Sequence, residues 1–145
     1  MVPGLVALVA ATLFAGAALY ITLVEHPARM GLDDGPLLAQ WQPSYKRALP
    51  IQAGLAVLGG AAGLLGWYSL RDWQWMAGSL LLLANWPFTM LVIMPTNTRL
   101  MAMRPQHAGA ESRDLLRRWG GLHGVRSLLG AAASLLFAWG FLVAR

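Results

Sequence analysis

The sequence predicts an all-α integral membrane protein, a single domain of residues 1–145 folded as an up-down-up-down four-helix bundle. Hydrophobic residues make up 57% of the chain and charged residues only 12%, about half of the roughly 25% that is usual in soluble domains. Four apolar stretches, residues 4–24, 48–68, 75–94 and 120–143, contain no acidic residue and no lysine. Each has about 20 residues, enough to cross ~30 Å of hydrocarbon.

The first apolar stretch is expected to remain as a membrane span. A cleaved signal peptide would have a basic N-terminal region and a shorter apolar core, whereas residues 1–24 contain no basic residue. The second and third spans are joined by "SLRDWQ" (residues 69–74), so we expect them to be antiparallel neighbours. Small residues in the second span, Gly54, Gly59, Gly60, Gly63 and Gly66, favour close helix packing.

The basic residues predict the orientation of the bundle in the membrane. Residues 25–47 and 95–119 carry eight lysines and arginines, whereas the opposite side has only Arg71 and Arg145. We therefore expect loops 25–47 and 95–119 in the cytoplasm and both termini outside it, in the inner membrane of a bacterium. Contacts with anionic lipid account for the net charge of +5, without a nucleic-acid partner. The chain has no cysteine, which excludes disulfides and thiolate ligands.

Polar residues in or beside the spans gather toward the same end as the two basic connections. Trp119, His123 and Arg126 follow one helical stripe, at i, i+4 and i+7, and an unpaired charge facing lipid would cost several kcal/mol. We therefore expect an inward stripe and a pocket open to the cytoplasm. The other candidates for its walls are Glu25, His26, Gln52, Asn85 and Asn97.

Structural roles compete with functional ones at several of these positions. His123 could bond a neighbouring helix carbonyl, and Asn85 could join helices through its amide. Arg126 could reach the headgroups or pair with Glu25, directly or through His26. We expect the Arg126–Glu25 pair.

Three prolines are expected to interrupt helices. Pro87 should kink the third span by removing a backbone hydrogen bond, and Asn85 could satisfy a carbonyl that the kink frees. Pro95 is expected to end the third span, and Pro27 is expected to end the first span at His26.

Four segments carry a resemblance to a known family: "TLVEHPAR" after the first span, "ANWPFT" and "IMPTNTRL" in the third, and "WGGLHGVRS" at the start of the fourth. With them the chain resembles the anthrone oxygenase-like family of small four-span membrane proteins, most of them bacterial and uncharacterised. The resemblance extends from the first span to the fourth. It implies, from fungal polyketide members, oxygenation of an anthrone to an anthraquinone without a bound cofactor.

That chemistry is compatible with the candidate residues. His123 or His26 could remove a proton from an electron-rich phenolic substrate, and Arg126 could stabilise the resulting anion or superoxide. The expected substrate-binding residues are Glu25, Gln52, Asn85, Asn97 and Trp119, with Trp119 stacking on an aromatic ring.

Other functions remain open at this point. Glu25, His26 and His123 offer one carboxylate and two imidazoles, a ligand set for iron or copper, and haem is a further alternative cofactor. The chain could also be a non-catalytic membrane subunit, a lipid- or quinone-binding module, or a transporter. The expected partners are membrane lipid and a hydrophobic small-molecule substrate. A homo-oligomer or a membrane-complex partner stays open.

Overall fold

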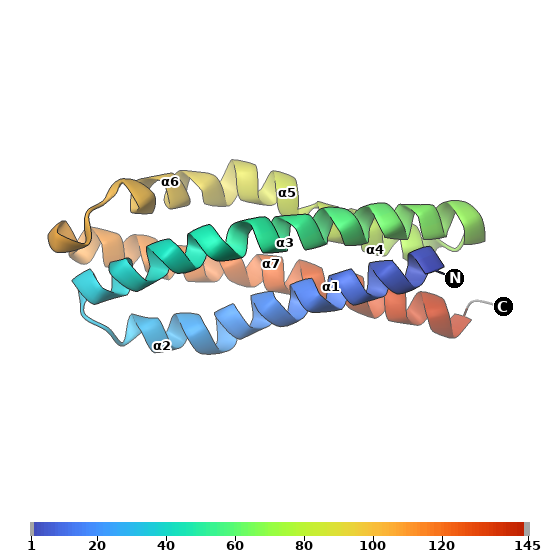
Figure 1. Cartoon of the computed structure of the whole chain (residues 1–145), viewed down its shortest axis with the longest axis horizontal. Coiled ribbons are helices and arrows are strands. Elements are labelled where there is room, and N and C mark those ends of the chain that lie inside the picture. The colour runs from blue at the N-terminus through green and yellow to red at the C-terminus, as the bar shows by residue number, and fades with distance from the viewer. Residues whose placement is uncertain (1, 144–145) are drawn as a thin grey trace.

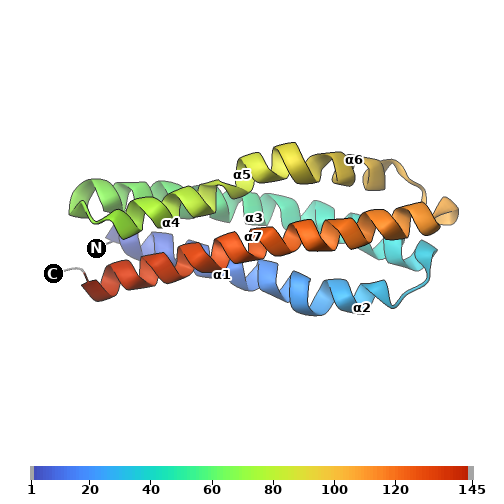
Figure 2. The same cartoon turned by 180° about the vertical axis from the view of Figure 1, so that it is seen from behind.

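Four long helical segments form the protein and run antiparallel to their neighbours in the chain (Figure 1). The structure, a computed structural model, describes residues 2–143. The segments Val2–Met30, Asp34–Leu70, Trp73–Ala102 and Ala110–Val143 are each long and apolar enough to cross a membrane. The start of α1 and the end of α7 lie at the same end of the bundle in both views (Figures 1 and 2). The predicted four-helix membrane bundle is confirmed.

Two of these segments, the first and the third, contain changes of helix type. The first consists of α1 (Val2–Tyr20), the π-helical η1 (Ile21–Glu25) and α2 (His26–Met30), and the second is the continuous α3 (Asp34–Leu70). The third consists of α4 (Trp73–Leu83), α5 (Asn85–Phe88), the π-helical η2 (Thr89–Ile93) and α6 (Met94–Ala102). A short 3-10 turn, η3 (Pro105–His107), leads into α7 (Ala110–Val143).

The connections expected at residues 25–47 and 95–119 are mostly helical, so the predicted loop boundaries are wrong. The non-helical parts there are confined to residues 31–33 and the region around η3. With 37 residues, α3 is roughly 55 Å long at ~1.5 Å per residue. The helices therefore continue well beyond an apolar layer of ~30 Å at this end, which we call the loop end.

Pro27 and Pro95 do not end their helices, contrary to the prediction. The backbone N–H of His26 and that of Met94, each directly before a proline, donate to the first carbonyl of η1 and of η2, five residues back. A proline has no N–H to donate to the carbonyl four residues back. The wider π turn absorbs this missing bond, so the helix continues through α2 and through α6.

The interruption expected from Pro87 is confirmed and lies at Ala84, where a turn separates α4 from α5. The Asn85 side-chain amide donates to the carbonyl oxygens of Leu82 at 3.0 Å and Leu81 at 3.5 Å. It thereby bonds carbonyls of the last turn of α4, but not that of Leu83, whose backbone donor Pro87 removes.

Two hydrophobic clusters fill the bundle, one at each end. The cluster near the termini packs Phe14, Trp75 and Phe137 among alanines of α1 and α3. The cluster at the loop end includes Leu37, Leu38, Trp41, Leu100 and Leu116, whose side chains are all 0% exposed. The loop end of the bundle is therefore closed by packed side chains.

Candidate functional site

Buried polar side chains lie between the two hydrophobic clusters. They come from all four helical segments and include Thr89, Gln52, Asn85, Asn97, His26, Arg29, His123, Arg126 and Ser127. His123 is 2% exposed and Arg126 is 8% exposed. Charged and polar groups at this depth are costly in a membrane protein and commonly mark functional sites.

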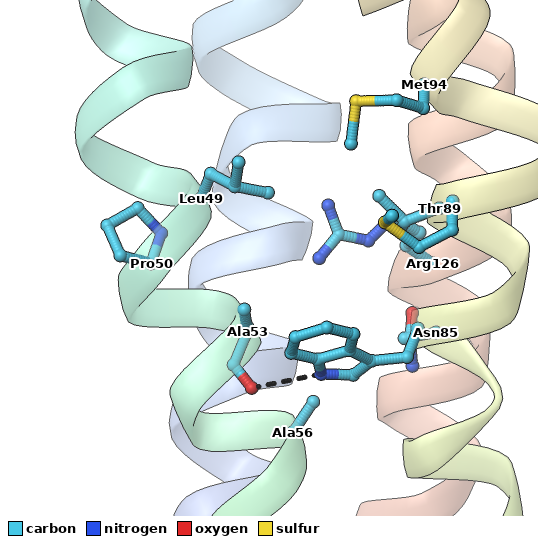
Figure 3. A pocket seen from close by; sticks show the side chains of 10 residues that line it. Leu49, Pro50, Ala53, Ala56, Asn85, Thr89, Met94 and Arg126 are labelled. Carbon is cyan, nitrogen blue, oxygen red and sulfur yellow. Dashed lines mark hydrogen bonds between the residues drawn. The ribbon is translucent and has the colours of Figure 1, made fainter.

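A cavity of about 290 Å³ lies between α3 on one side and α5, η2 and the start of α6 on the other (Figure 3). We call it the large pocket. Arg126 reaches into it from α7, between Leu49 and Thr89 in the view of Figure 3. Apart from Arg126, its lining is Leu49, Pro50, Ala53, Ala56, Asn85, Trp86, Thr89, Met90 and Met94. An apolar cavity with a few polar groups is the usual form of a small-molecule site.

Three polar residues line the large pocket, and each has an atom without a protein partner. Asn85 Oδ1, Thr89 Oγ1 and Arg126 Nε are buried and make no hydrogen bond to the described residues. Buried polar atoms in proteins are nearly always paired. These three atoms are therefore unpaired polar groups buried in the wall of the large pocket.

A second, much smaller pocket of about 20 Å³ adjoins the large one, and Leu49 and Arg126 line both. Its polar walls include Tyr45, Gln52, Asn97 and His123. Asn97 Oδ1 also lacks a hydrogen-bond partner among the described residues. A space of this size holds about one water molecule. The Arg126 guanidinium thus connects a large apolar compartment with a small polar one.

Arg126 does not pair with Glu25, so that prediction is wrong. Glu25 accepts a hydrogen bond from Ser44 at 2.7 Å and forms an ion pair with Arg29. Arg29 is four residues away on the same helical segment, where side chains face each other. The guanidinium of Arg126 lies instead over the Phe14 ring, 5.6 Å from its centre, and the ion pairs of residues 2–143 involve other arginines.

The imidazole of His123 is held by a chain of hydroxyl groups. Thr22 Oγ1 lies 3.0 Å from His123 Nδ1 and 2.8 Å from Ser127 Oγ, and Ser127 donates to the His123 carbonyl at 3.3 Å. The His123 carbonyl can only accept, so the Ser127 hydroxyl uses its hydrogen to donate to it. Ser127 Oγ then accepts from the Thr22 hydroxyl, and Thr22 Oγ1 accepts from Nδ1–H of His123 when every group is paired. That arrangement leaves a free lone pair on Nε2.

Aromatic rings hold both imidazoles in place. Trp119 stacks on His123 with ring centres 4.8 Å apart, and it contacts His26 at 5.1 Å and Trp41 at 5.6 Å. His26 lines neither pocket, and its ring packs directly on Gly120, where a side chain would collide with Nε2. His26 is therefore in a position to support Trp119 and not to contact a ligand.

Glu25, His26 and His123 do not assemble into a metal site. Glu25 contacts Arg29 and Ser44, His26 packs on Gly120, and His123 contacts Thr22. No cluster of three such ligands occurs within residues 2–143. The proposed ligand set for iron or copper does not fit this geometry.

The other sequence-predicted site residues do meet. Gln52, Asn97, Trp119, His123 and Arg126 line the small pocket, and Asn85 lines the large one. The loop-end cluster fills the end of the bundle toward which the pocket was expected to open. The side of the membrane on which that end lies stays a prediction.

Tyr45 and Thr89 were missed as site residues. Tyr45 lies near Asn97 and Arg126, and its signal was the helical spacing from Trp41 through Tyr45 to Gln52. A loop, which is what the sequence predicts for residues 25–47, has no helical spacing, so this stripe does not emerge from the sequence. Thr89 was visible only as a neighbour of Asn85 at i+4.

Comparison with known proteins places the chain in a family. The sequence profile described as "Anthrone oxygenase" matches residues 41–136. The chain is 28% identical over 145 residues to an anthrone oxygenase of Claviceps purpurea, with 90% of this chain and 83% of the relative covered. It is 30% identical over 138 residues to anthrone oxygenase nsrD of Aspergillus novofumigatus, with 84% of this chain and 82% of the relative covered.

A third relative, anthrone oxygenase tpcL of Aspergillus fumigatus, is 49% identical over 53 residues, covering 34% of this chain and 33% of the relative. These relatives are fungal and give no support to the expected bacterial origin. No solved structure matches the chain. Since the profile covers well over half of the sequence, the chain belongs to the anthrone oxygenase family.

Proposed function

We propose that the protein is a membrane-embedded oxygenase that oxidises a hydrophobic phenolic aromatic compound of the anthrone type with dioxygen. The observation that carries this proposal is the position of Arg126, a buried cation without a carboxylate partner, at the junction of the large apolar pocket and the small His123 pocket. Such a cation suits an anion that forms during a reaction in a low-dielectric site. The names of the relatives supply the compound class.

The reaction begins with proton removal. His123 Nε2, through a water molecule in the small pocket, takes a proton from the acidic CH₂ carbon between the two aromatic rings, and the negative charge spreads onto the carbonyl oxygen of the central ring. Arg126 stabilises that oxyanion. The large pocket holds the apolar ring system, and Asn85 Oδ1 accepts a hydrogen bond from a phenolic hydroxyl, which would pair an atom that has no protein partner.

Dioxygen then accepts electrons from the carbanion and forms a bond to the same carbon, which gives a peroxide anion that takes the proton back from the His123 imidazolium. Loss of the second C–H proton and cleavage of the O–O bond leave a C=O group and one water. The balance is CH₂ plus O₂ to C=O plus H₂O. The substrate supplies all the electrons, so the proposed reaction proceeds without a bound cofactor.

The test is turnover of dihydroxyanthrone by purified protein in lipid vesicles. We expect one dioxygen consumed for each dihydroxyanthraquinone formed, with isotopically labelled dioxygen appearing in the new carbonyl and with turnover unaffected by a metal chelator. His123→Gln should lower kcat by about 100-fold or more, with a melting shift of only a few degrees. His107→Gln, in the exposed turn η3, is the matched control.

A non-catalytic binding module is the competing function. It predicts saturable binding of dihydroxyanthraquinone by wild-type protein together with no oxygen consumption above the rate of empty vesicles. That outcome, or normal turnover by His123→Gln, would contradict the proposed reaction.

A further inference from the structure

We infer that the aromatic substrate enters the large pocket sideways from the lipid, through the opening between α3 and α5–η2, and that Trp86 is the gate of this opening. The inference rests on the proposed function for the identity of the substrate. It adds a route and a gating residue that the reaction itself does not require.

The loop end offers no entrance for a ring system. The side chains of Leu37, Leu38, Trp41, Leu100 and Leu116 are fully buried there. A cavity of about 510 Å³ lies at the loop end, between the end of α6 and the start of α7, but it shares no lining residue with the small pocket beside Arg126. That small pocket, of about 20 Å³, is far below the several hundred cubic ångströms of ordinary ligand sites. A rigid aromatic molecule can therefore not approach Arg126 from that side without unpacking the bundle.

The large pocket, in contrast, has an outer rim that faces lipid. Pro50, Trp86 and Met90 line it, and Trp86 is 44% and Met90 54% exposed. All three lie inside the apolar stretches 48–68 and 75–94, at the level of the hydrocarbon. α3 packs closely along α4, the helix that precedes Ala84. It has far fewer contacts with α5, the helix that follows Ala84. The break in the third segment thus opens the bundle laterally (Figure 3).

Trp86 crosses this opening. Its indole Nε1–H donates to the Ala53 carbonyl of α3 at 3.3 Å, the bond drawn as a dashed line in Figure 3. One long hydrogen bond between neutral groups holds the indole only weakly. The Ala53 carbonyl belongs to α3, and that helix does not require the bond to Trp86 for its stability. Ala53 and Ala56 leave space beside the ring. The indole can therefore swing outward, where lipid accommodates it.

The polar groups set the direction in which the substrate enters. Arg126 lies at the inner end of the pocket, and the rim is apolar. Asn85 Oδ1 and Thr89 Oγ1, both unpaired, lie on the wall. A planar molecule dissolved in the bilayer would therefore enter edge first, with its polar groups turned toward Arg126 and its ring system against Leu49, Met90 and Met94.

The first experiment fills the opening from one wall. Ala53 and Ala61 are both on α3, but Ala53 lines the pocket and Ala61 faces outward. Ala53→Trp should weaken binding of the stable probe dihydroxyanthraquinone at least tenfold, measured without oxygen in lipid vesicles, and Ala61→Trp should leave it unchanged. Equal affinities of the two variants, with wild-type protein binding the probe, would overturn the inference.

The second experiment measures the gate. Trp86→Phe keeps the ring but removes the N–H donor, so the association and dissociation rates of the probe should rise together, several-fold, at a nearly constant Kd. Trp139→Phe, also an exposed tryptophan but on α7 beside Trp73, should change neither rate. Unchanged rates in Trp86→Phe would overturn the gating role.

The third experiment identifies the source of the substrate. At one fixed aqueous concentration, dihydroxyanthrones of increasing bilayer–water partition should turn over faster, in proportion to their concentration in the bilayer. A rate that follows the aqueous concentration alone would overturn lateral entry. Absence of turnover and of probe binding in wild-type protein would be a failure of the proposed function instead, so the two failures are distinguishable.

Discussion

Thr22 Oγ1 lies 3.0 Å from His123 Nδ1 across the interface of η1 and α7, and pairing of the whole hydroxyl chain makes Thr22 the acceptor of a hydrogen bond from Nδ1–H. Thr22 is itself tied to Ser127, 2.8 Å away. The hydroxyl pair therefore selects the imidazole tautomer that leaves Nε2 free to act as a base. This positioning depends on the π turn that contains Thr22.

Thr22→Val should lower kcat of dihydroxyanthrone oxidation by about tenfold to 100-fold, because the imidazole loses its tautomer control while its Trp119 stack remains. KM should change little, since Thr22 lines neither pocket. Thr22→Ser keeps the hydroxyl and should restore most of the rate. Steady-state kinetics of the three proteins check this, and a valine variant with normal kcat contradicts it.

Arg126→Met should weaken probe binding by about tenfold to 100-fold, the loss expected for a hydrogen bond to a charged group. It should leave the melting temperature unchanged or raise it, because no carboxylate loses its partner.

Arg29→Met is the informative contrast. It leaves Glu25 with only Ser44 and Gln40, and should destabilise the fold by up to about 3 kcal/mol with little direct effect on the probe. Thermal melting and probe titration of both variants decide between these expectations. A large melting loss in Arg126→Met would point to a structural partner for that cation.

Gly120→Ala and Gly121→Ala form a matched pair on α7. A methyl group at Gly120 would collide with His26 Nε2, whereas Gly121 has open space. We expect Gly120→Ala to cost about 1–3 kcal/mol of unfolding free energy through displacement of the ring, and Gly121→Ala to add about 0.5–1 kcal/mol through helix propensity. Chemical denaturation in detergent measures both, and equal effects would show that the His26 packing is unimportant.

Topology reporters at Arg71 and at the C-terminus should both be extracytoplasmic. The end of α3 and the end of α7, which precede these positions, lie at the end of the bundle opposite the eight basic residues. Lysines and arginines are retained on the cytoplasmic side. A reporter inserted at Gly109 should give the opposite signal. A cytoplasmic C-terminus would reverse the predicted orientation.

The prolines show where prediction from local rules failed. Pro27 and Pro95 were read as helix ends because each removes a backbone donor, yet η1 and η2 carry the chain past them. Whether a proline ends a helix or is absorbed by a π turn depends on what packs beyond it. Here the loop-end cluster gains from continued helix, with Leu100 on α6 buried in it. Pro87 followed the local rule because the break at Ala84 is stabilised locally by Asn85.

The sequence by itself determined the membrane class, the four spans and the stripe of Trp119, His123 and Arg126, because apolar length and helical spacing are properties of single segments. Tertiary structure decided which groups pair. Arg29 and Arg126 were both candidate partners for Glu25. Arg29, one helical turn away, forms the ion pair, and Arg126 has no carboxylate partner among the described residues. It also decided where the pocket opens, since that depends on how α3 and α5 separate and on which side chains fill the loop end. Packing between segments is a property of pairs of surfaces, and no single stretch of sequence encodes it.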